Sequence, residues 1–271
     1  MAFNILELSS FSGKPVALYE FVYGSASWFY CAYEKTLVVN GITYQPIAIS
    51  DGGFKMSGEP SDDMVTITCD ATIPIANMLN GAPPSETIWV NIRRYHHGDN
   101  EAPLIWVGYV ATRKQTSPVA VEIRCKMLTS GFDRDGARLT YNRMCPHVLY
   151  CIDCRVNKAL HSRTVLVEAL TGNSVTSSFL SPLANGYLAN GYFEWSRFAG
   201  ALERRAIESH TGTTFTVLGA TAGLEVGDYI TVYPGCGRTR ADCRAKFNNL
   251  ANYGGWAHLP GKSPFEGDPV F

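Results

Sequence analysis

The sequence predicts a mostly β protein of two domains, the second of which carries a cluster of cysteines. Short runs of alternating apolar and polar residues indicate strands. The length of 271 residues exceeds that of a usual single domain, and the composition shifts around residues 129–138. We therefore expect an N-terminal β-rich domain at residues 1–130 and a C-terminal cysteine-rich domain at residues 131–271, with a small β barrel inserted at residues 164–233.

The N-terminal half contains several runs that are typical of strands, rich in the β-branched and aromatic residues that pack well on a pleated surface. These runs are Ala17–Tyr23, Met64–Cys69, Thr87–Arg94, Leu104–Ala111 and Val119–Cys125. Asn40 and Gly41 separate two short apolar runs and both tolerate positive φ, so they predict a two-residue hairpin turn. A proline followed by helix formers predicts a short helix at Pro74–Leu79.

Local patterns also predict the structure of a loop in the N-terminal half and of strands and a helix in the C-terminal half. The polar residues from His96 to Asn100 predict a hairpin tip whose histidines are solvated. In the C-terminal half the β pattern returns, with strands expected near Phe193–Trp195 and Phe215–Leu218. One short helix is expected at Thr239–Ala251, because its apolar residues recur at helical spacing.

Composition excludes several classes of function. The formal net charge is -1, which lacks the basic excess of a protein that neutralises many phosphates, so nucleic acid is not expected as the main partner. We see no export signal and no apolar run long enough to cross a bilayer, so no membrane insertion is expected. Only 17% of the residues are charged, which indicates that much of the surface faces partners.

The eight cysteines fall into two groups. Cys31, Cys69 and Cys125 lie in apolar strand patterns and are predicted to be buried as small hydrophobic residues. The other five are clustered in MCPHVLYCIDC and GCGRTRADC, and they are Cys145, Cys151, Cys154, Cys236 and Cys243. Because a chain without an export signal stays in a reducing compartment, thiols or metal ligands are expected here rather than disulfides.

Four soft thiolates select zinc or an iron–sulfur cluster. Cys151 and Cys154 have the tight spacing of a zinc arm, so zinc stays open. The wider pairs, Cys145 with Cys154 and Cys236 with Cys243, suit a bulkier cluster better. The spacing of the cysteines by itself therefore supports zinc and an iron–sulfur cluster almost equally.

Several motifs together resemble the phage tail-tip hub family, which contains the minor tail protein L of lambda-like phages and is similar to the hub protein of gene transfer agents. The C-terminal motifs are Cys145-Pro146-His147-Val148-Leu149-Tyr150 followed by Cys154, then Val226-Gly227-Asp228, Gly235-Cys236, Cys243, Lys246-Phe247-Asn248-Asn249, Asn252-Tyr253-Gly254-Gly255 and Leu259-Pro260-Gly261. The N-terminal motifs match more loosely and are Trp28-Phe29-Tyr30, Gly41-Ile42-Thr43-Tyr44-Gln45-Pro46 and Trp106-Val107-Gly108-Tyr109-Val110.

The resemblance implies a 4Fe–4S cluster held by C-x8-C and C-x6-C pairs, which correspond to Cys145, Cys154, Cys236 and Cys243. It leaves Cys151 outside the cluster, although this thiol is near enough in sequence to replace a ligand. The resemblance also makes the N-terminal half a hub domain and the C-terminal half an iron–sulfur domain.

The function implied is that of a structural virion protein without enzymatic activity, located at the tail tip or baseplate and synthesised in the host cytoplasm. Its implied partners are two further copies in a trimer, the distal tail protein, and the central tail fibre or receptor-binding protein. The alternative is a metal-binding phage enzyme of cell-wall entry. No local signature of a nucleophile, a zinc protease or a nucleotide site supports that alternative.

Overall fold

The chain divides into two compact units, one of residues 1–134 and 196–203, the other of residues 135–195 and 204–271. The computed structural model describes residues 2–9, 11–54, 64–80, 83–99, 101–131, 141–198 and 201–259. The domain boundary expected at residues 129–138 lies partly outside these ranges. No helix in the described part of the chain is long and apolar enough to cross a membrane.

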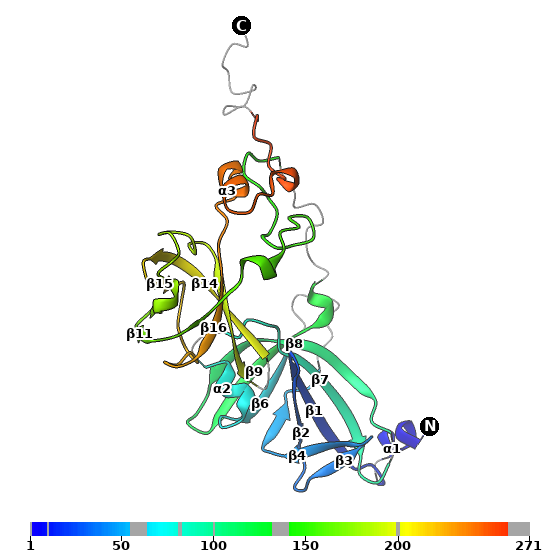
Figure 1. Ribbon diagram of the computed structural model, residues 1–271. Helices are drawn as coiled ribbons and strands as arrows, with labels where there is room; N and C mark the ends of the chain where they lie inside the picture. Colours follow the sequence, from blue (N-terminus) through cyan, green and yellow to red (C-terminus); the bar gives the residue numbers. More distant parts are fainter. Residues whose placement is uncertain are drawn as a thin grey trace. The chain divides into compact units, whose positions relative to one another are not determined.

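The first unit is built on a nine-stranded sheet in the order β3-β4-β2-β1-β7-β8-β9-β6-β5 (Figure 1). Its elements are α1 (Ala2–Glu7), β1 (Pro15–Tyr23), β2 (Ala26–Cys31), β3 (Leu37–Val39), β4 (Ile42–Pro46), β5 (Ile49–Asp51), β6 (Met64–Asp70), α2 (Pro74–Met78), β7 (Trp89–His96), β8 (Leu104–Gln115), β9 (Ala120–Met127) and the 3-10 helix η1 (Leu128–Gly131). All five strand runs predicted from the N-terminal half lie largely within these strands. β2 and β4 pair in parallel, whereas their neighbours in the sheet pair antiparallel.

The predicted hairpin turn is confirmed, because Asn40 and Gly41 join β3 to β4 with φ of 52° and 79°. The short helix predicted from Pro74 is confirmed as α2, which ends one residue earlier than expected. Cys69 and Cys125 lie in the main core of this unit, and Cys31 lies in a second, smaller core. Their prediction as buried small hydrophobic residues is confirmed.

The prediction of a solvated histidine pair is confirmed for His97, which is exposed, and wrong for His96, which is 2% exposed. The backbone N–H of Lys14 donates to Nδ1 of His96 at 3.0 Å, so the proton of the neutral ring lies on Nε2. Nε2 is 2.8 Å from the carboxylate of Glu7. These contacts attach α1 to β7, and they arise between residues that are far apart in sequence.

A buried carboxylate joins separate segments of the first unit. Glu203, at the start of β14 (Ala201–Thr211), is fully buried. Its oxygens accept hydrogen bonds from the hydroxyl of Tyr23 at 2.8 Å and from the N–H and hydroxyl of Ser85 at 3.1 and 2.7 Å. Burial and the neighbouring Glu203 raise the pKa of the Tyr23 hydroxyl, which therefore stays protonated as a donor.

Glu203→Ala is expected to destabilise the protein by about 3 kcal/mol, because buried donors would lose their acceptor. Chemical denaturation with an intrinsic fluorescence readout measures this change. Glu208→Ala, an exposed position on the same strand, is the matched control and should change stability by less than about 0.5 kcal/mol. Equal effects of the two variants would contradict the assigned role of Glu203.

The second unit contains a seven-stranded sheet in the order β10-β16-β13-β14-β15-β12-β11, in yellow-green to orange in Figure 1. Its elements are η2 (Lys158–His161), β10 (Arg163–Leu166), β11 (Ala169–Thr171), β12 (Ser174–Thr176), η3 (Ser178–Leu180), β13 (Tyr192–Phe198), β14, β15 (Thr214–Val217), β16 (Tyr229–Tyr233), α3 (Arg240–Ala245) and η4 (Leu250–Asn252). The strand order is open in its hydrogen bonding, with β10 and β11 at its ends. The small β barrel expected at residues 164–233 is therefore confirmed in part, as an open half-barrel.

The single helix expected at Thr239–Ala251 is shorter in the structure. Thr239 caps α3, because its hydroxyl accepts from the N–H of Asp242 at 3.2 Å. The helix ends at Ala245, and Asn248 then adopts φ of 46°. This left-handed residue turns the chain away from the helix axis, and the remaining residues form the separate turn η4.

His210 on β14 is 3% exposed, and neither ring nitrogen has a hydrogen-bond partner among the described residues. Burial lowers the pKa of His210 below its ordinary value of 6.5. The nearby backbone groups of Gly212 and Ala184 act in the opposite direction and offset only part of this shift. The unfolded chain therefore binds this proton more readily than the folded one, and folding stability is lost as the pH falls below about 6.5.

We expect the thermal midpoint of the wild-type protein to fall between about pH 7.5 and about pH 5.5, and this fall to be smaller in His210→Leu. Each unit of pKa depression corresponds to about 1.4 kcal/mol of lost stability at low pH. His258→Leu, at an exposed position, should keep the wild-type pH dependence. An unchanged profile in His210→Leu would assign the acid sensitivity to other groups.

Candidate thiol site

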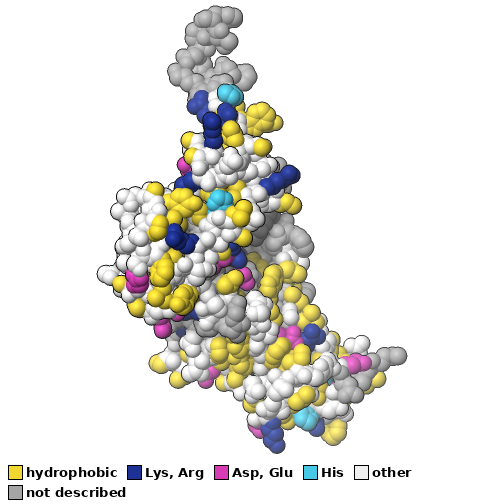
Figure 2. Space-filling view, viewed as in Figure 1, with side chains coloured by type: hydrophobic (Ala, Val, Ile, Leu, Met, Phe, Trp, Pro, Cys, Tyr) yellow, Lys and Arg dark blue, Asp and Glu magenta, His cyan; other side chains and the backbone are white. Residues whose placement is uncertain are grey.

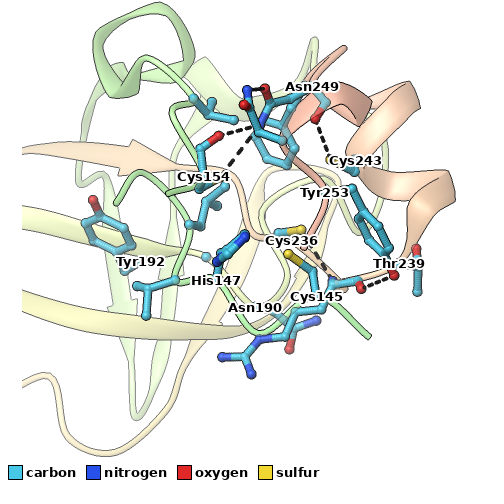
Figure 3. Close-up of a pocket in the computed structure, with 17 residues that line it drawn as sticks. Cys145, His147, Cys154, Asn190, Tyr192, Cys236, Thr239, Cys243, Asn249 and Tyr253 are labelled. Carbon is cyan, nitrogen blue, oxygen red and sulfur yellow. Dashed lines mark hydrogen bonds between the residues drawn. The ribbon is translucent and has the colours of Figure 1, made fainter. Parts of the chain in front are cut away.

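The four cysteines paired in the sequence analysis line one cavity of about 220 Å³ in the second unit (Figure 3). Cys145 and Cys154 come from the loop before β10, Cys236 follows β16, and Cys243 lies on α3. In Figure 3 the sulfur atoms of Cys145 and Cys236 lie side by side near the middle of the cavity. The fold thus brings together two cysteine pairs that are separated by the whole seven-stranded sheet.

The first pair is presented by a tight turn. Arg155 N–H donates to the carbonyl of Cys151 at 2.9 Å, and Tyr150 and Arg155 adopt φ of 68° and 59° at its two ends. The hydroxyl of Tyr150 donates to the carbonyl of Pro234 at 3.2 Å. This bond ties the first cysteine loop to the residues immediately before Cys236.

The second pair depends on close approach of backbone segments. A Cβ at Gly235 would lie 2.1 Å from the carbonyl oxygen of Ala189 and 2.3 Å from the nitrogen of Gly191, so only glycine fits there. The ammonium group of Lys246 donates to the carbonyl of Gly235 at 3.0 Å and to that of Tyr187 at 3.1 Å. The loop that carries Cys236 is therefore fixed on both of its sides.

The loop between Cys236 and α3 is also bonded to the first pair. Gly237 N–H donates to the carboxylate of Asp242 at 2.7 Å, which closes the loop onto the start of the helix. Cys145 N–H donates to the carbonyl of Arg238 at 2.9 Å. The positions of Cys145, Cys236 and Cys243 are thus coupled through the backbone.

N–H groups are directed at three of the four sulfur atoms. Gly254 N–H lies 3.4 Å from Sγ of Cys145, and Arg238 N–H lies 3.3 Å from Sγ of Cys236. The side-chain amide of Asn249 lies 3.9 Å from Sγ of Cys154 and donates to the carbonyl of that residue at 2.5 Å. N–H groups near cysteine sulfur stabilise thiolates and tune bound metal centres.

Burial raises the pKa of two of the four cavity thiols, those of Cys236 and Cys243. Burial raises the pKa of Cys236, and Asp242, Cys145 and Cys154 raise it further, whereas the hydrogen bond from the N–H of Arg238 lowers it. Burial and the three neighbouring thiols raise the pKa of Cys243, and its sulfur lies 3.2 Å from the carbonyl of Asn249, to which it donates. Metal ligation would therefore displace protons from this site.

The donor set fits a soft metal centre, since it offers four thiols around one cavity and N–H donors directed at sulfur. Among the described residues, no group of three or more His, Cys, Asp or Glu side chains forms a ready site for a single metal ion. A cluster differs from a single ion because each cysteine binds its own iron. Cys151 is not among the residues that line the cavity.

Residues of the sequence motifs gain structural roles that spacing did not predict. A Cβ at Gly254 would lie 2.2 Å from Nε2 of His147, which also lines the cavity. Asn249 and Lys246 donate hydrogen bonds to the cysteine loops, roles that cysteine spacing does not predict. Pro260 and Gly261 of the last motif lie outside the described residues.

The chain is a β-rich protein of two compact units, with four cysteines around one cavity of the second unit. Residues 186–263 match a family model described as phage conserved hypothetical protein BR0599. A chain from the solved structure "Virion of native gene transfer agent (GTA) particle" has a TM-score of 0.84 and 16% sequence identity, covering 99% of this chain and 96% of that chain. This similarity shows a shared fold.

A protein of Xylella fastidiosa (strain 9a5c), described as an uncharacterized protein, is 27% identical over 137 residues. The matched segment is 46% of this chain, and the match spans 28% of the length of that relative.

Proposed function

We propose that this chain is a structural virion protein of a phage or phage-like particle, specifically the hub of a tail tip. The observation that carries the proposal is the likeness in fold to a chain of a gene transfer agent virion over nearly the full length of both chains. The phage family model adds independent support, since its match includes Cys236, Cys243 and the motifs that follow them.

Exposed apolar side chains support assembly with other subunits. Phe11 is 96% exposed and Ile152 is 85% exposed, and Figure 2 shows hydrophobic side chains in several groups on the face in view. Contiguous groups of exposed apolar side chains, rather than single ones, are typical of surfaces that bind other proteins. The proposed partners are two further copies in a trimer, the distal tail protein, and the central tail fibre or receptor-binding protein.

We further propose that Cys145, Cys154, Cys236 and Cys243 hold a 4Fe–4S cluster, with zinc as the competing occupant. When bound, the cluster supplies four metal–thiolate bonds that join the loop before the seven-stranded sheet to the loop and helix after it. Closing so long a segment stabilises the folded second unit. Iron and labile-sulfide analysis of protein purified without oxygen separates the two occupants.

The hub proposal is tested by locating the chain in the particle. Electron microscopy of virions labelled with an antibody against this chain should place it at the tail tip, in a ring of three copies. Label at the head or along the tail tube would overturn the hub assignment. Absence from purified particles would overturn the structural role altogether.

A further inference from the structure

A second thiol lies beside Cys154 on the same turn. Cys154 N–H points to Sγ of Cys151 at 3.4 Å, and Arg155 N–H donates to the carbonyl of Cys151. Helical rise and radius put residues three apart in such a turn about 5 Å from each other at Cα. Disulfides need a Cα separation of roughly 4.4–6.8 Å, so the backbone of this turn holds the two cysteines within the range that a disulfide spans.

The two cysteines differ in what surrounds them. Cys154 lines the thiol cavity and is bonded to Asn249, whereas Cys151 does not line the cavity. Cys151 is half-buried and is followed by exposed Ile152 and Asp153, so small reagents reach this part of the turn. Sγ of Cys154 is thus available either to a metal in the cavity or to Cys151, but not to both.

We infer that Cys151 and Cys154 form an oxidisable pair, whose disulfide withdraws Cys154 from the cavity and prevents metal ligation there. The disulfide itself is independent of the proposed cluster, whereas the competition rests on it. The ligand site of this chain thereby becomes sensitive to the thiol–disulfide state of its surroundings.

A small-molecule disulfide such as oxidised glutathione is a sufficient oxidant. The Cys151 thiolate attacks one glutathione sulfur, which forms a mixed disulfide and releases the first glutathione thiolate. The Cys154 thiolate then attacks Sγ of Cys151 and displaces the second glutathione thiolate. Two cysteine thiols are oxidised, one glutathione disulfide is reduced to two thiols, and the two cysteine protons pass to solvent or to the departing thiolates.

The pair is tested first on full-length protein without metal. The protein is incubated with oxidised glutathione, its free thiols are alkylated, and it is digested with trypsin without reduction. Cleavage after Arg143 and Arg155 yields one peptide that contains Cys145, Cys151 and Cys154. We expect this peptide to lose two hydrogen atoms and to carry one alkyl group, on Cys145. Cys151→Ser should abolish the internal disulfide, and a disulfide from Cys154 to Cys145 or Cys236 instead would overturn the inference.

The competition is tested on protein loaded with iron and sulfide. Bound iron should protect Cys154 from the disulfide, and excess oxidised glutathione should release iron more slowly from Cys151→Ser than from wild type. Equal rates of release would overturn the competition. Failure to load either protein would instead contradict the proposed cluster, while the metal-free experiment would still decide whether the pair forms.

Discussion

Cys236→Ser is expected to abolish cluster binding and to destabilise the second unit. Cys236 contributes one of four sulfurs and sits where two loops are bonded together, so serine would leave the metal site incomplete. Structural zinc sites contribute on the order of 10 kcal/mol of apparent binding free energy, and four iron–thiolate bonds should be comparable. Iron content after anaerobic purification and the thermal midpoint of the second unit measure the two parts of this expectation.

Two matched variants separate ligand loss from general damage. Cys151→Ser alters a thiol that lies outside the cavity and should keep its iron. Cys69→Ser alters a buried core thiol of the first unit and should lower stability without loss of iron. If Cys236→Ser kept both its iron and its thermal midpoint, the cavity would not be a cluster site.

Local signals in the sequence were sufficient where neighbouring residues determine the structure. The turn at Asn40 and Gly41 requires only two residues that accept positive φ, and alternation marked strands such as β6, whose buried residues follow every second position. The helix α1 was missed for the opposite reason. It has six residues, and the contacts that position it include the pair of Glu7 with His96, which are 89 residues apart.

The candidate site was predictable in its thiols but not in their surroundings. Cysteine type and clustering indicated five candidate ligands, and the family resemblance reduced them to Cys145, Cys154, Cys236 and Cys243. The fold brings these four to one cavity. The hydrogen bonds of Asn249 depend on the left-handed turn at Asn248. This turn follows a helix that ends earlier than the spacing of apolar residues predicted. Asn190 and Tyr192, which also line the cavity, come from the chain segment between the two cysteine pairs, and cysteine spacing says nothing about them.

Gly235 is also constrained by residues far away in the sequence. Outside the ligands, we expect substitution of Gly235 to have the most severe effect of any single change. Gly235→Ala would place its Cβ 2.1 Å from the carbonyl oxygen of Ala189 and 2.2 Å from the carbonyl carbon of Asn190. Both are backbone atoms, so no side-chain rotation relieves the overlap. The strand end and the adjoining turn would have to separate, which also displaces the carbonyl that accepts from Lys246.

We expect Gly235→Ala to destabilise the second unit by more than about 3 kcal/mol, in the range of overpacked or strained core positions. Iron should be lost as well, because the next residue is Cys236. Gly131→Ala is the matched control, since a Cβ there meets nothing within 4 Å, and it should keep wild-type stability and iron. The opposite outcome is that Gly235→Ala loses stability but keeps its iron. The loop that carries Cys236 would then move without displacing the Cys236 thiol. In that case the close packing around Gly235 would stabilise the sheet and not the thiol site.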